Sequence, residues 1–188
     1  IWDSISFSQL KFLPPMEQGK VDFWVKVRDN IETTEPAIRI EVSVSDVREI
    51  ITAKINTKLS FFQRGYFNQG PFSNFGPLPP RAGSSTSYTI RWQVRNGQNN
   101  IDNAKVRAVL PDYVRLSENI SPNEAQIFFD STSREVVWDI GYLESGSAAE
   151  VYFQIIFDPR INQKGEVVDL IYEANITGTD LWTDSVIR

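Results

Sequence analysis

The sequence contains no cysteine and no histidine. Without cysteine there is no disulfide, no thiolate nucleophile and no cysteine-ligated metal. Without histidine there is no Ser-His-Asp triad, no imidazole metal ligand and no histidine acting as general acid or base. These two absences exclude most familiar hydrolase, zinc and copper chemistries. Exported bacterial proteins often lack cysteine, as do many cytosolic ones.

Long apolar runs and an excess of positive charge are also missing. No stretch approaches the roughly 18 to 20 apolar residues that cross a bilayer as a helix. The net charge of −5, from 19 basic and 24 acidic residues, argues against a nucleic-acid-binding surface, which requires clustered Lys and Arg. The chain has no secretory signal segment and begins at Ile1, so we expect it to be a piece of a longer protein.

Apolar and polar residues alternate along much of the chain. A content of 41% hydrophobic residues in 188 is typical of a folded chain with one or two cores. The clearest alternation runs from Ile38 to Val44, and no stretch of ten residues favours the helical period. We therefore predict an all-β chain, with residues 46–51 ambiguous. The expected strands cover 21–27, 38–44, 55–61, 88–94, 104–110, 127–129, 136–140, 151–157 and 170–176.

Residues 64–83 differ from their surroundings because they are rich in proline, glycine and aromatic residues. Proline at this density cannot contribute to a central strand, so we predict a long loop with an edge-like extended stretch. Its aromatic side chains either plug the open end of a sandwich or form an exposed platform for a sugar or a peptide. The platform residues would be Tyr66, Phe67, Phe72 and Phe75.

Three sequence features occur twice in the same order. Trp138-Asp139 repeats Trp2-Asp3. The alternation of Val151–Phe157 repeats that of residues 21–27, and Thr179-Asp180-Leu181 echoes residues 45–47. A repeat of this length predicts tandem domains. The predicted fold is two tandem Ig-like β-sandwich domains, the first lacking its N-terminal strands.

The repeat places the domain boundary at residue 54. Residues 54–188, which include the Pro/Gly/aromatic loop 64–83, predict a complete sandwich, whereas residues 1–53 predict only the C-terminal part of one. A sandwich without its first strands exposes its core and an unpaired edge. The missing strands come either from upstream sequence or from another chain by donor-strand complementation. The second alternative predicts a filament, because a head-to-tail contact that does not close propagates.

Several short segments carry a resemblance to a known family. They cover residues 58–67, 76–80, 88–92, 108–111, 133–141 and 143–146. Together they resemble bacterial "conserved repeat" surface domains of unknown function, which are Ig-like modules found in tandem in large exported envelope proteins, including those of candidate-phylum bacteria. Residues 2–3, 23–25 and 41–44 are similar to the preceding, more divergent domain of such chains. The resemblance implies an extracytoplasmic structural or adhesive module, and it carries over no catalytic site.

Paired carboxylates are the catalytic option that remains without histidine, since glycoside hydrolysis requires only two. The pairs to consider are Glu124 with Asp130 and Asp180 with Asp184. Acidic residues near turns are usually solvated, however, so we expect no enzyme activity.

Calcium is the one cofactor that the sequence leaves open. Residues 96–103 and 179–184 form oxygen-rich loops. Neither has the alternating Asp spacing of a calcium loop, and the first also suits a plain turn. We expect no cofactor, with Ca²⁺ at an interdomain joint as the alternative.

The tryptophans fall into two groups. Trp92 and Trp138 lie in phase with apolar neighbours, so we predict that they anchor the core. Trp24 is out of phase with the apolar set of its strand, and Trp182 lies at a strand end. We therefore predict that Trp24 and Trp182 contact another domain or subunit.

These observations predict a non-catalytic structural or assembly module of a bacterial cell-surface protein, namely a stalk, a filament or an envelope segment. The expected location is extracytoplasmic, at the cell surface. The expected partners are neighbouring domains or subunits of the same protein, including head-to-tail contacts, with no nucleic acid and no membrane span in this segment. The alternative is an adhesive module that binds a glycan or a peptide through the aromatic loop 66–75.

Overall fold

The computed structural model describes residues 5, 11–12, 14–20, 22–27, 31, 33–44 and 46–188. The chain divides into two units, residues 1–31 and residues 32–188. The described residues of the first unit form no strand and no helix. The strands of the described chain therefore all belong to the second unit.

The second unit begins with a two-stranded hairpin. Strands β1 (Ala37–Val44) and β2 (Val47–Lys54) pair antiparallel, with Ile40 opposite Ile51. The stretch that was ambiguous in the sequence is thus the first part of β2. The hairpin forms a sheet of its own. Because an isolated hairpin is only marginally stable in water, it depends on contacts at its base and along its faces.

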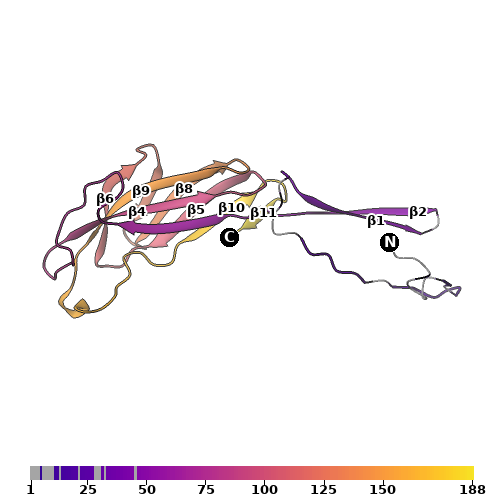
Figure 1. Cartoon of the computed structure of the whole chain (residues 1–188), viewed down its shortest axis with the longest axis horizontal. Coiled ribbons are helices and arrows are strands. Elements are labelled where there is room, and N and C mark those ends of the chain that lie inside the picture. The colour runs from indigo at the N-terminus through magenta and orange to yellow at the C-terminus, as the bar shows by residue number, and fades with distance from the viewer. Residues whose placement is uncertain are drawn as a thin grey trace. The chain divides into compact units, whose positions relative to one another are not determined.

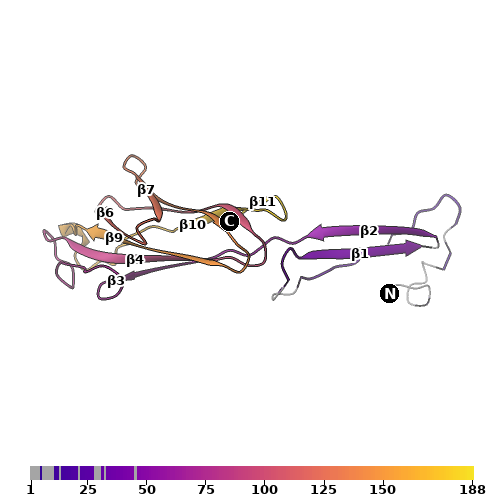
Figure 2. The ribbon, with the colours of Figure 1, turned by 90° about the horizontal axis from the view of Figure 1, so that it is seen from above.

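The remaining strands form two antiparallel sheets that pack face to face as a β-sandwich (Figures 1 and 2). One sheet has the order β3-β4-β9-β6 and the other the order β11-β10-β5-β8-β7. The prediction of an all-β sandwich is confirmed. The strands are β3 (Ser60–Tyr66), β4 (Thr86–Arg95), β5 (Ile101–Val109), β6 (Val114–Ser121), β7 (Gln126–Asp130), β8 (Glu135–Leu143), β9 (Ala148–Phe157), β10 (Asn175–Asp180) and β11 (Ser185–Ile187), with one 3₁₀ turn, η2 (Ile161–Gln163).

Because side chains alternate along each strand, the apolar ones of both sheets point inward and form one core. Trp92 of β4 is completely buried, and its ring meets those of Phe153 and Phe61 edge to face at centroid distances of 4.8 and 5.9 Å. Its indole N–H donates a 2.6 Å hydrogen bond to Gln63 Oε1, which satisfies the polar end of the ring. Trp138 of β8 is also buried. Both tryptophans are core residues, as predicted.

One predicted strand does not form. Of the stretch 21–27, residues 22–27 are described and lie outside any strand. Alternation shows only which side chains are apolar, whereas a strand also needs a neighbouring strand for its N–H and C=O groups. Residues 2–3, the first copy of the Trp-Asp repeat, lie outside the described residues. The tandem arrangement and the division at residue 54 therefore stay predictions.

Other boundaries differ from expectation because backbone groups find partners outside the sheets. Thr57 N–H donates to the Asp180 side chain at 2.7 Å and Ile55 N–H to the carbonyl of Pro36 at 2.9 Å, so β3 begins only at Ser60. The predicted strand 170–176 reduces to its last two residues, where β10 begins. Strands β6 and β11 are missing from the prediction, since β6 is rich in polar residues and β11 has only three.

The proline-rich loop after β3 is fixed to the sandwich by polar contacts. Asn74 Nδ2 donates to Phe67 O and Thr89 Oγ1, both at 2.9 Å. Gly76, with φ +99°, lies so close to the start of β4 that an added Cβ would meet Ser85 O at 2.2 Å. Only glycine fits this backbone conformation at this distance.

This contact gives a test of the loop. We expect Gly76→Ala to lower the free energy of unfolding by at least about 2 kcal/mol more than Gly83→Ala, because it adds a backbone clash to the strain of a positive φ. Gly83 is the matched control, since its φ is +80° and nothing lies within 4 Å of an added Cβ. Urea unfolding of both variants measures the difference, and equal losses would contradict the close approach.

Candidate functional site

A buried carboxylate lies where the hairpin joins the sandwich. Asp180, the last residue of β10, has no solvent exposure. Its Oδ2 accepts hydrogen bonds from the backbone N–H of Thr57 at 2.7 Å and from the Asn99 amide at 2.8 Å. Its Oδ1 accepts from the backbone N–H groups of Trp182 at 2.9 Å and Thr183 at 3.2 Å. These donors occupy the four lone-pair positions of the carboxylate.

The hydrogen bonds decide the charge of this group. Burial by itself raises the pKa of Asp180, but the hydrogen bonds from Asn99, Thr57, Thr183 and Trp182 favour the ionised form, and the pKa lies below its ordinary value. Asp180 is therefore a carboxylate at neutral pH. With its lone pairs occupied, it holds three chain segments together and has none left for a substrate proton or a metal.

Trp182 fixes the base of the hairpin from the same place. Its indole N–H donates to the carbonyl of Pro36, directly before β1, at 3.0 Å. Lys54, the last residue of β2, donates from Nζ to the carbonyl of Trp182 at 2.8 Å and lies 4.3 Å from the centroid of its ring. Trp182 thus connects the C-terminal strands to the base of the hairpin, at the start of β1 and at the end of β2. The predicted contact of Trp182 with another domain or subunit stays a prediction.

One face of the hairpin is more apolar than the other, although Glu49 lies opposite Val42 on the more apolar face and Ile50 lies opposite Glu41 on the more polar face. Residues directly opposite each other in a strand pair share a face, and the register places Ile38 opposite Ala53 and Ile40 opposite Ile51. Val42 of this face is 39% exposed and Ile51 is 49% exposed. The polar face carries an ion pair between Arg48 and Glu41 at 2.6 Å. We call the first surface, formed by Ile38, Ile40, Val42, Val47, Glu49, Ile51 and Ala53, the hairpin apolar face.

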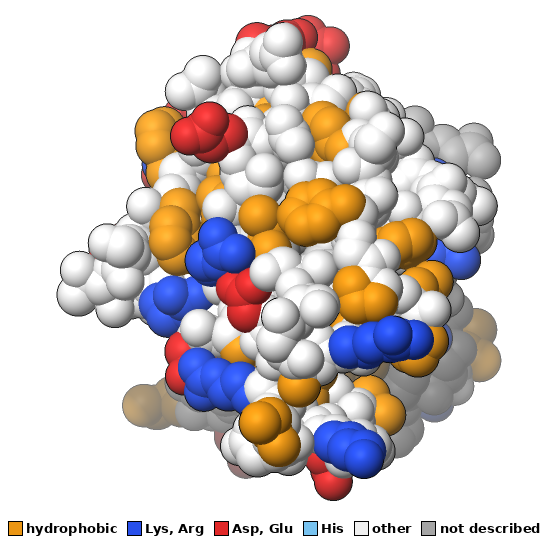
Figure 3. All heavy atoms as spheres, turned by 90° about the vertical axis from the view of Figure 1, so that its left-hand side faces the viewer, with side chains coloured by type: hydrophobic (Ala, Val, Ile, Leu, Met, Phe, Trp, Pro, Cys, Tyr) orange, Lys and Arg blue, Asp and Glu red, His pale blue; other side chains and the backbone are white. Residues whose placement is uncertain are grey.

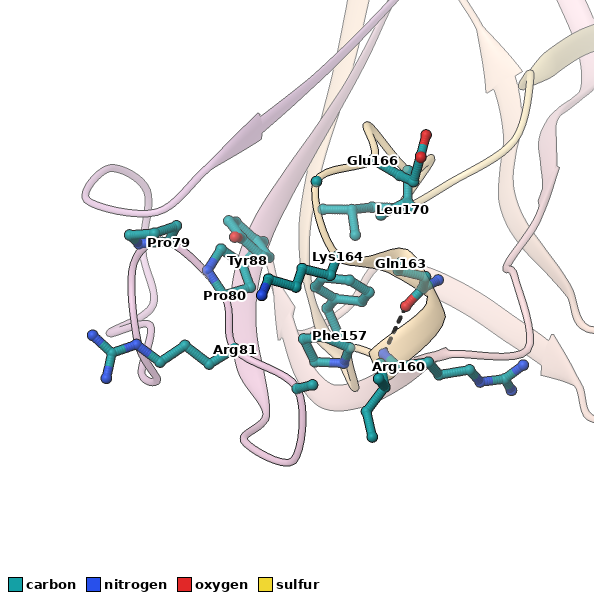
Figure 4. Close-up of a pocket in the computed structure, with 15 residues that line it drawn as sticks. Pro79, Pro80, Arg81, Tyr88, Phe157, Arg160, Gln163, Lys164, Glu166 and Leu170 are labelled. Atoms are coloured by element: carbon teal, nitrogen blue, oxygen red, sulfur yellow. Dashed lines mark hydrogen bonds between the residues drawn. The ribbon is translucent and has the colours of Figure 1, made fainter.

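A groove lies at the end of the sandwich that carries the proline-rich loop and the loop after β9. Figure 3 shows hydrophobic side chains lying among Lys and Arg at this end. The groove has a volume of about 570 Å³, with Tyr88 and Phe157 among its lining residues (Figure 4). Burial raises the pKa of Tyr88. Arg160 of this groove is paired with Asp112 at 2.8 Å.

The predicted aromatic platform does not lie on one surface. Tyr66 ends β3 with the Arg64 guanidinium 5.4 Å from its ring centroid, whereas the ring of Phe67 packs edge to face on Tyr88 at 5.9 Å. Phe72 is half-buried and Phe75 is 50% exposed. Phe67 follows the end of β3 and packs on Tyr88, which shares its side of β4 with the core residues Ile90 and Trp92. Binding by the loop stays a prediction.

Trp24, the other predicted contact residue, is almost fully exposed, at 97%. It belongs to the first unit, where the described residues form no strand. Its predicted contact with another domain or subunit is not tested by the described contacts.

The two carboxylate pairs are not arranged as a catalytic dyad. Glu124 lies two residues before β7 and Asp130 is the last residue of β7, which spans about 13 Å from Gln126 to Asp130, whereas the two carboxyl groups of a glycosidase lie about 5 to 9.5 Å apart. The hydrogen bonds that Asp130 accepts from Thr132 and Ser133 stabilise its turn and lower its pKa. In the other pair, Asp180 is buried and fully bonded.

The oxygen-rich loops show no ligand set for calcium. In residues 96–103, Asn100 Oδ1 accepts the backbone N–H of Ser145 at 2.9 Å and Asn96 Oδ1 accepts the hydroxyl of Thr57 at 3.1 Å. Asn99 Oδ1 is buried without a hydrogen-bond partner among the described residues. The part of the chain that the structure describes holds no group of three or more acidic side chains placed for a metal.

Comparisons with known proteins give no family. No protein-family model and no curated protein matches the chain. The RrgA Jo.In complex is similar with 8% identity and a TM-score of 0.35, over 56% of this chain and 75% of that chain. BcpA, the major pilin subunit of Bacillus cereus, is similar with 12% identity and a TM-score of 0.40, over 72% of this chain and 41% of that chain.

A third solved structure is the yeast delta-COP-I mu-homology domain complexed with a Dsl1 WxWxV peptide. Its identity is 10% and its TM-score 0.33, over 70% of this chain and 45% of that chain. The chain spans less than half the length of the pilin and of this domain. These TM-scores are too low to carry an argument about function. Separately, none of the described helices could span a membrane.

Asp180→Asn tests the joint. We expect it to lower the free energy of unfolding at pH 7 by roughly 3 kcal/mol, because an amide cannot accept hydrogen bonds at all four positions. The folded pKa lies below the ordinary 3.8, so the stabilisation by ionised Asp180 is complete above that value and is lost as the pH falls through the folded pKa. Urea unfolding should therefore show the gap between wild type and variant closing in acid.

The exposed Asp184 provides the control for this measurement. Asp184→Asn removes the same charge four residues away and should change stability by less than about 0.5 kcal/mol. A gap for Asp180→Asn that persists unchanged down to pH 2 would contradict the assignment of a buried, ionised carboxylate.

Trp182→Ala tests the attachment of the hairpin. The variant loses a hydrogen bond and a cation–π contact, so we expect amide hydrogen exchange in β1 and β2 to become roughly tenfold faster, with little change in β4 and β9. Leu181→Ala is the control, because Leu181 is 51% exposed. Unchanged exchange in the hairpin of the Trp182 variant would show that Trp182 does not fix it.

Proposed function

We propose that this chain is a non-catalytic structural and assembly module of a bacterial cell-surface protein. Its hairpin apolar face packs against a neighbouring domain or subunit of the same protein, including in head-to-tail order. The single observation that carries the proposal is a hairpin that is fixed at its base by Trp182 and Lys54, yet presents exposed apolar side chains along one face.

The energetics of the hairpin support this proposal. Two strands alone cannot bury enough apolar surface to be stable, and removing exposed aliphatic side chains from water stabilises by about 25 cal/mol per Å². Val42, Val47 and Ile51 would gain most, since they are exposed by 39%, 72% and 49%. The polar face, with its Arg48–Glu41 ion pair, favours contact with water. We therefore expect the partner on the hairpin apolar face.

The chemistry of the side chains supports a non-catalytic role. The chain has no cysteine and no histidine. Asp180, the buried carboxylate at the joint, has its lone pairs occupied by N–H donors. A general base needs a free lone pair within reach of the proton that it removes. Asp180 therefore acts as a structural group in this proposal.

The cell-surface location rests on the resemblance of segments such as 58–67 and 133–141 to tandem envelope domains. A module of this kind would act by reach and by contact with its neighbours, which agrees with an element that presents one apolar face. Tandem Ig-like domains, with the first completed by upstream sequence or by another chain, are part of this proposal.

Site-specific photocrosslinking tests the proposal. A benzophenone amino acid in place of Ile51, in the full-length protein on the producing cell, should form a covalent adduct with another domain or copy of the same protein. The same substitution at Thr52, which lies on the polar face opposite Arg39, is the matched control. Mass spectrometry identifies the partner. No adduct from position 51, or equal yields at both positions, would overturn the proposal.

A further inference from the structure

The outer face of the sheet β3-β4-β9 carries a second, chemically different surface. Because directly paired residues share a face, the register places Phe62 beside Gln93, and Arg64 beside Arg91 and Tyr152. Arg95 lies on the same face, since it is four residues from Arg91 along β4. A hollow of about 340 Å³ lies here, lined by Phe62, Gln63, Arg64, Tyr66, Arg91, Gln93 and Arg95. We call these residues the arginine face.

Two arginines oppose each other directly on this face. Like charges in such a pair destabilise a sheet, and neighbouring strands are only about 4.8 Å apart. Glu150 compensates one of them, because its Oε2 accepts hydrogen bonds from both Nε and Nη2 of Arg91. Arg64 and Arg95 form no ion pair among the described residues. The face therefore keeps uncompensated positive charge, although the chain as a whole carries −5.

Aromatic rings hold these guanidinium groups in place. Arg64 lies 5.4 Å from the ring centroid of Tyr66, and Arg95 lies 5.7 Å from that of Phe62. Arg91 lies 6.0 Å from the ring of Tyr152. A guanidinium stacked on a ring keeps its N–H groups free for two parallel hydrogen bonds to a carboxylate or a sulfate. The arginines are thus arranged to receive anions with little loss of side-chain freedom.

The spacing of the charges indicates the size of the ligand. Arg91 and Arg95 are four positions apart along β4, which is about 13 Å, with the neutral Gln93 between them. One small anion cannot reach both positions, whereas a polymer with regularly repeated negative groups can. Between the charges, Phe62 is 53% exposed and offers an apolar ring surface.

From this arrangement we infer that the arginine face binds an anionic polysaccharide. Sugar rings present C–H groups that pack on Phe62 and Tyr66, and hydroxyl groups that accept from Gln93. Carboxylate or sulfate groups along the polymer pair with Arg64 and Arg95. A nucleic acid fits less well, because its dense phosphate backbone is matched by clustered Lys and Arg, whereas this face has only Arg64 and Arg95 without an ion pair among the described residues. An acidic peptide offers carboxylates to clustered arginines but no sugar-like C–H faces for Phe62, and poly-L-glutamate in the test below distinguishes the two ligands.

This inference does not rest on the assembly proposed above, because the arginine face and the hairpin apolar face share no residue. A failure of glycan binding leaves the crosslinking result at Ile51 unaffected, and the reverse also holds. If both proposals are correct, the module would bind its neighbour through the hairpin and a polysaccharide through the arginine face.

Binding measurements on the whole chain test the inference. Isothermal titration or biolayer interferometry would compare an oligogalacturonate, which carries only carboxylates, with dextran sulfate, which carries only sulfates, and with neutral dextran. We expect binding to one or both anionic polymers, weakened by salt, and no binding to dextran. The double variant Arg64→Ala with Arg95→Ala should weaken binding by roughly tenfold for each arginine.

The control variant is Arg107→Ala, which removes the same charge from the other sheet, where Arg107 pairs with Glu135 at 2.9 Å. Arg64→Lys keeps the charge and loses the two-pronged geometry, so we expect an intermediate affinity. Thermal unfolding confirms that each variant is folded. Absence of binding to both anionic polymers would overturn the inference. So would equal weakening by Arg107→Ala, or tighter binding to poly-L-glutamate or single-stranded DNA than to either polysaccharide.

Discussion

A buried negative charge without a neighbouring cation constrains this fold more than any other single group. Taking a carboxylate out of water costs several kcal/mol, and Asp180 meets that cost only because four N–H groups converge on it. The donors come from the segment before β3, from the β4–β5 turn and from the turn after β10. These three segments must therefore adopt one arrangement together, and the N–H of Trp182 is one of the four donors.

The hairpin depends on that arrangement. With its backbone tied to Asp180, Trp182 directs its indole N–H to Pro36 and its carbonyl to Lys54. The sandwich, with Trp92 and Phe153 in its core, is a rigid body. The joint fixes β1 and β2 to it, and these two strands would be only marginally stable alone. The two surfaces described above differ in chemistry. The hairpin apolar face is mainly aliphatic, whereas the arginine face consists of arginines stacked on aromatic rings.

The sequence allowed the central strands to be predicted because each is buried on one face and paired on both sides. In 88–94 and 151–157 the alternation matches β4 and β9 closely. It failed at 22–27, 55–59 and 170–174, where apolar residues alternate but the described residues lie outside the strands; Tyr172 N–H, for example, donates to Val109 O at 3.1 Å without continuing the ladder. Trp182 could be singled out by its place at a strand end. The sequence pointed to Asp180 only as a carboxylate-pair and loop residue; its buried structural role could not be predicted, because an acidic residue near a turn resembles a solvated one and its donor Thr57 is 123 residues away. The arginine face depends on the β3–β4 register, which alternation does not determine.

The joint also determines how the chain would respond to mechanical tension. The chain enters the sandwich at residues 54–57 and turns into its last strand at residues 180–185, and both places meet at Asp180 and Trp182. A pulling force applied between the hairpin and β11 would act on these few hydrogen bonds. It would bypass the long pairing of β4 with β9. If the chain were tethered through these two points, the force would pass through the joint and not through the core of the sandwich. The core would then stay folded at extensions that break the hydrogen bonds of the joint.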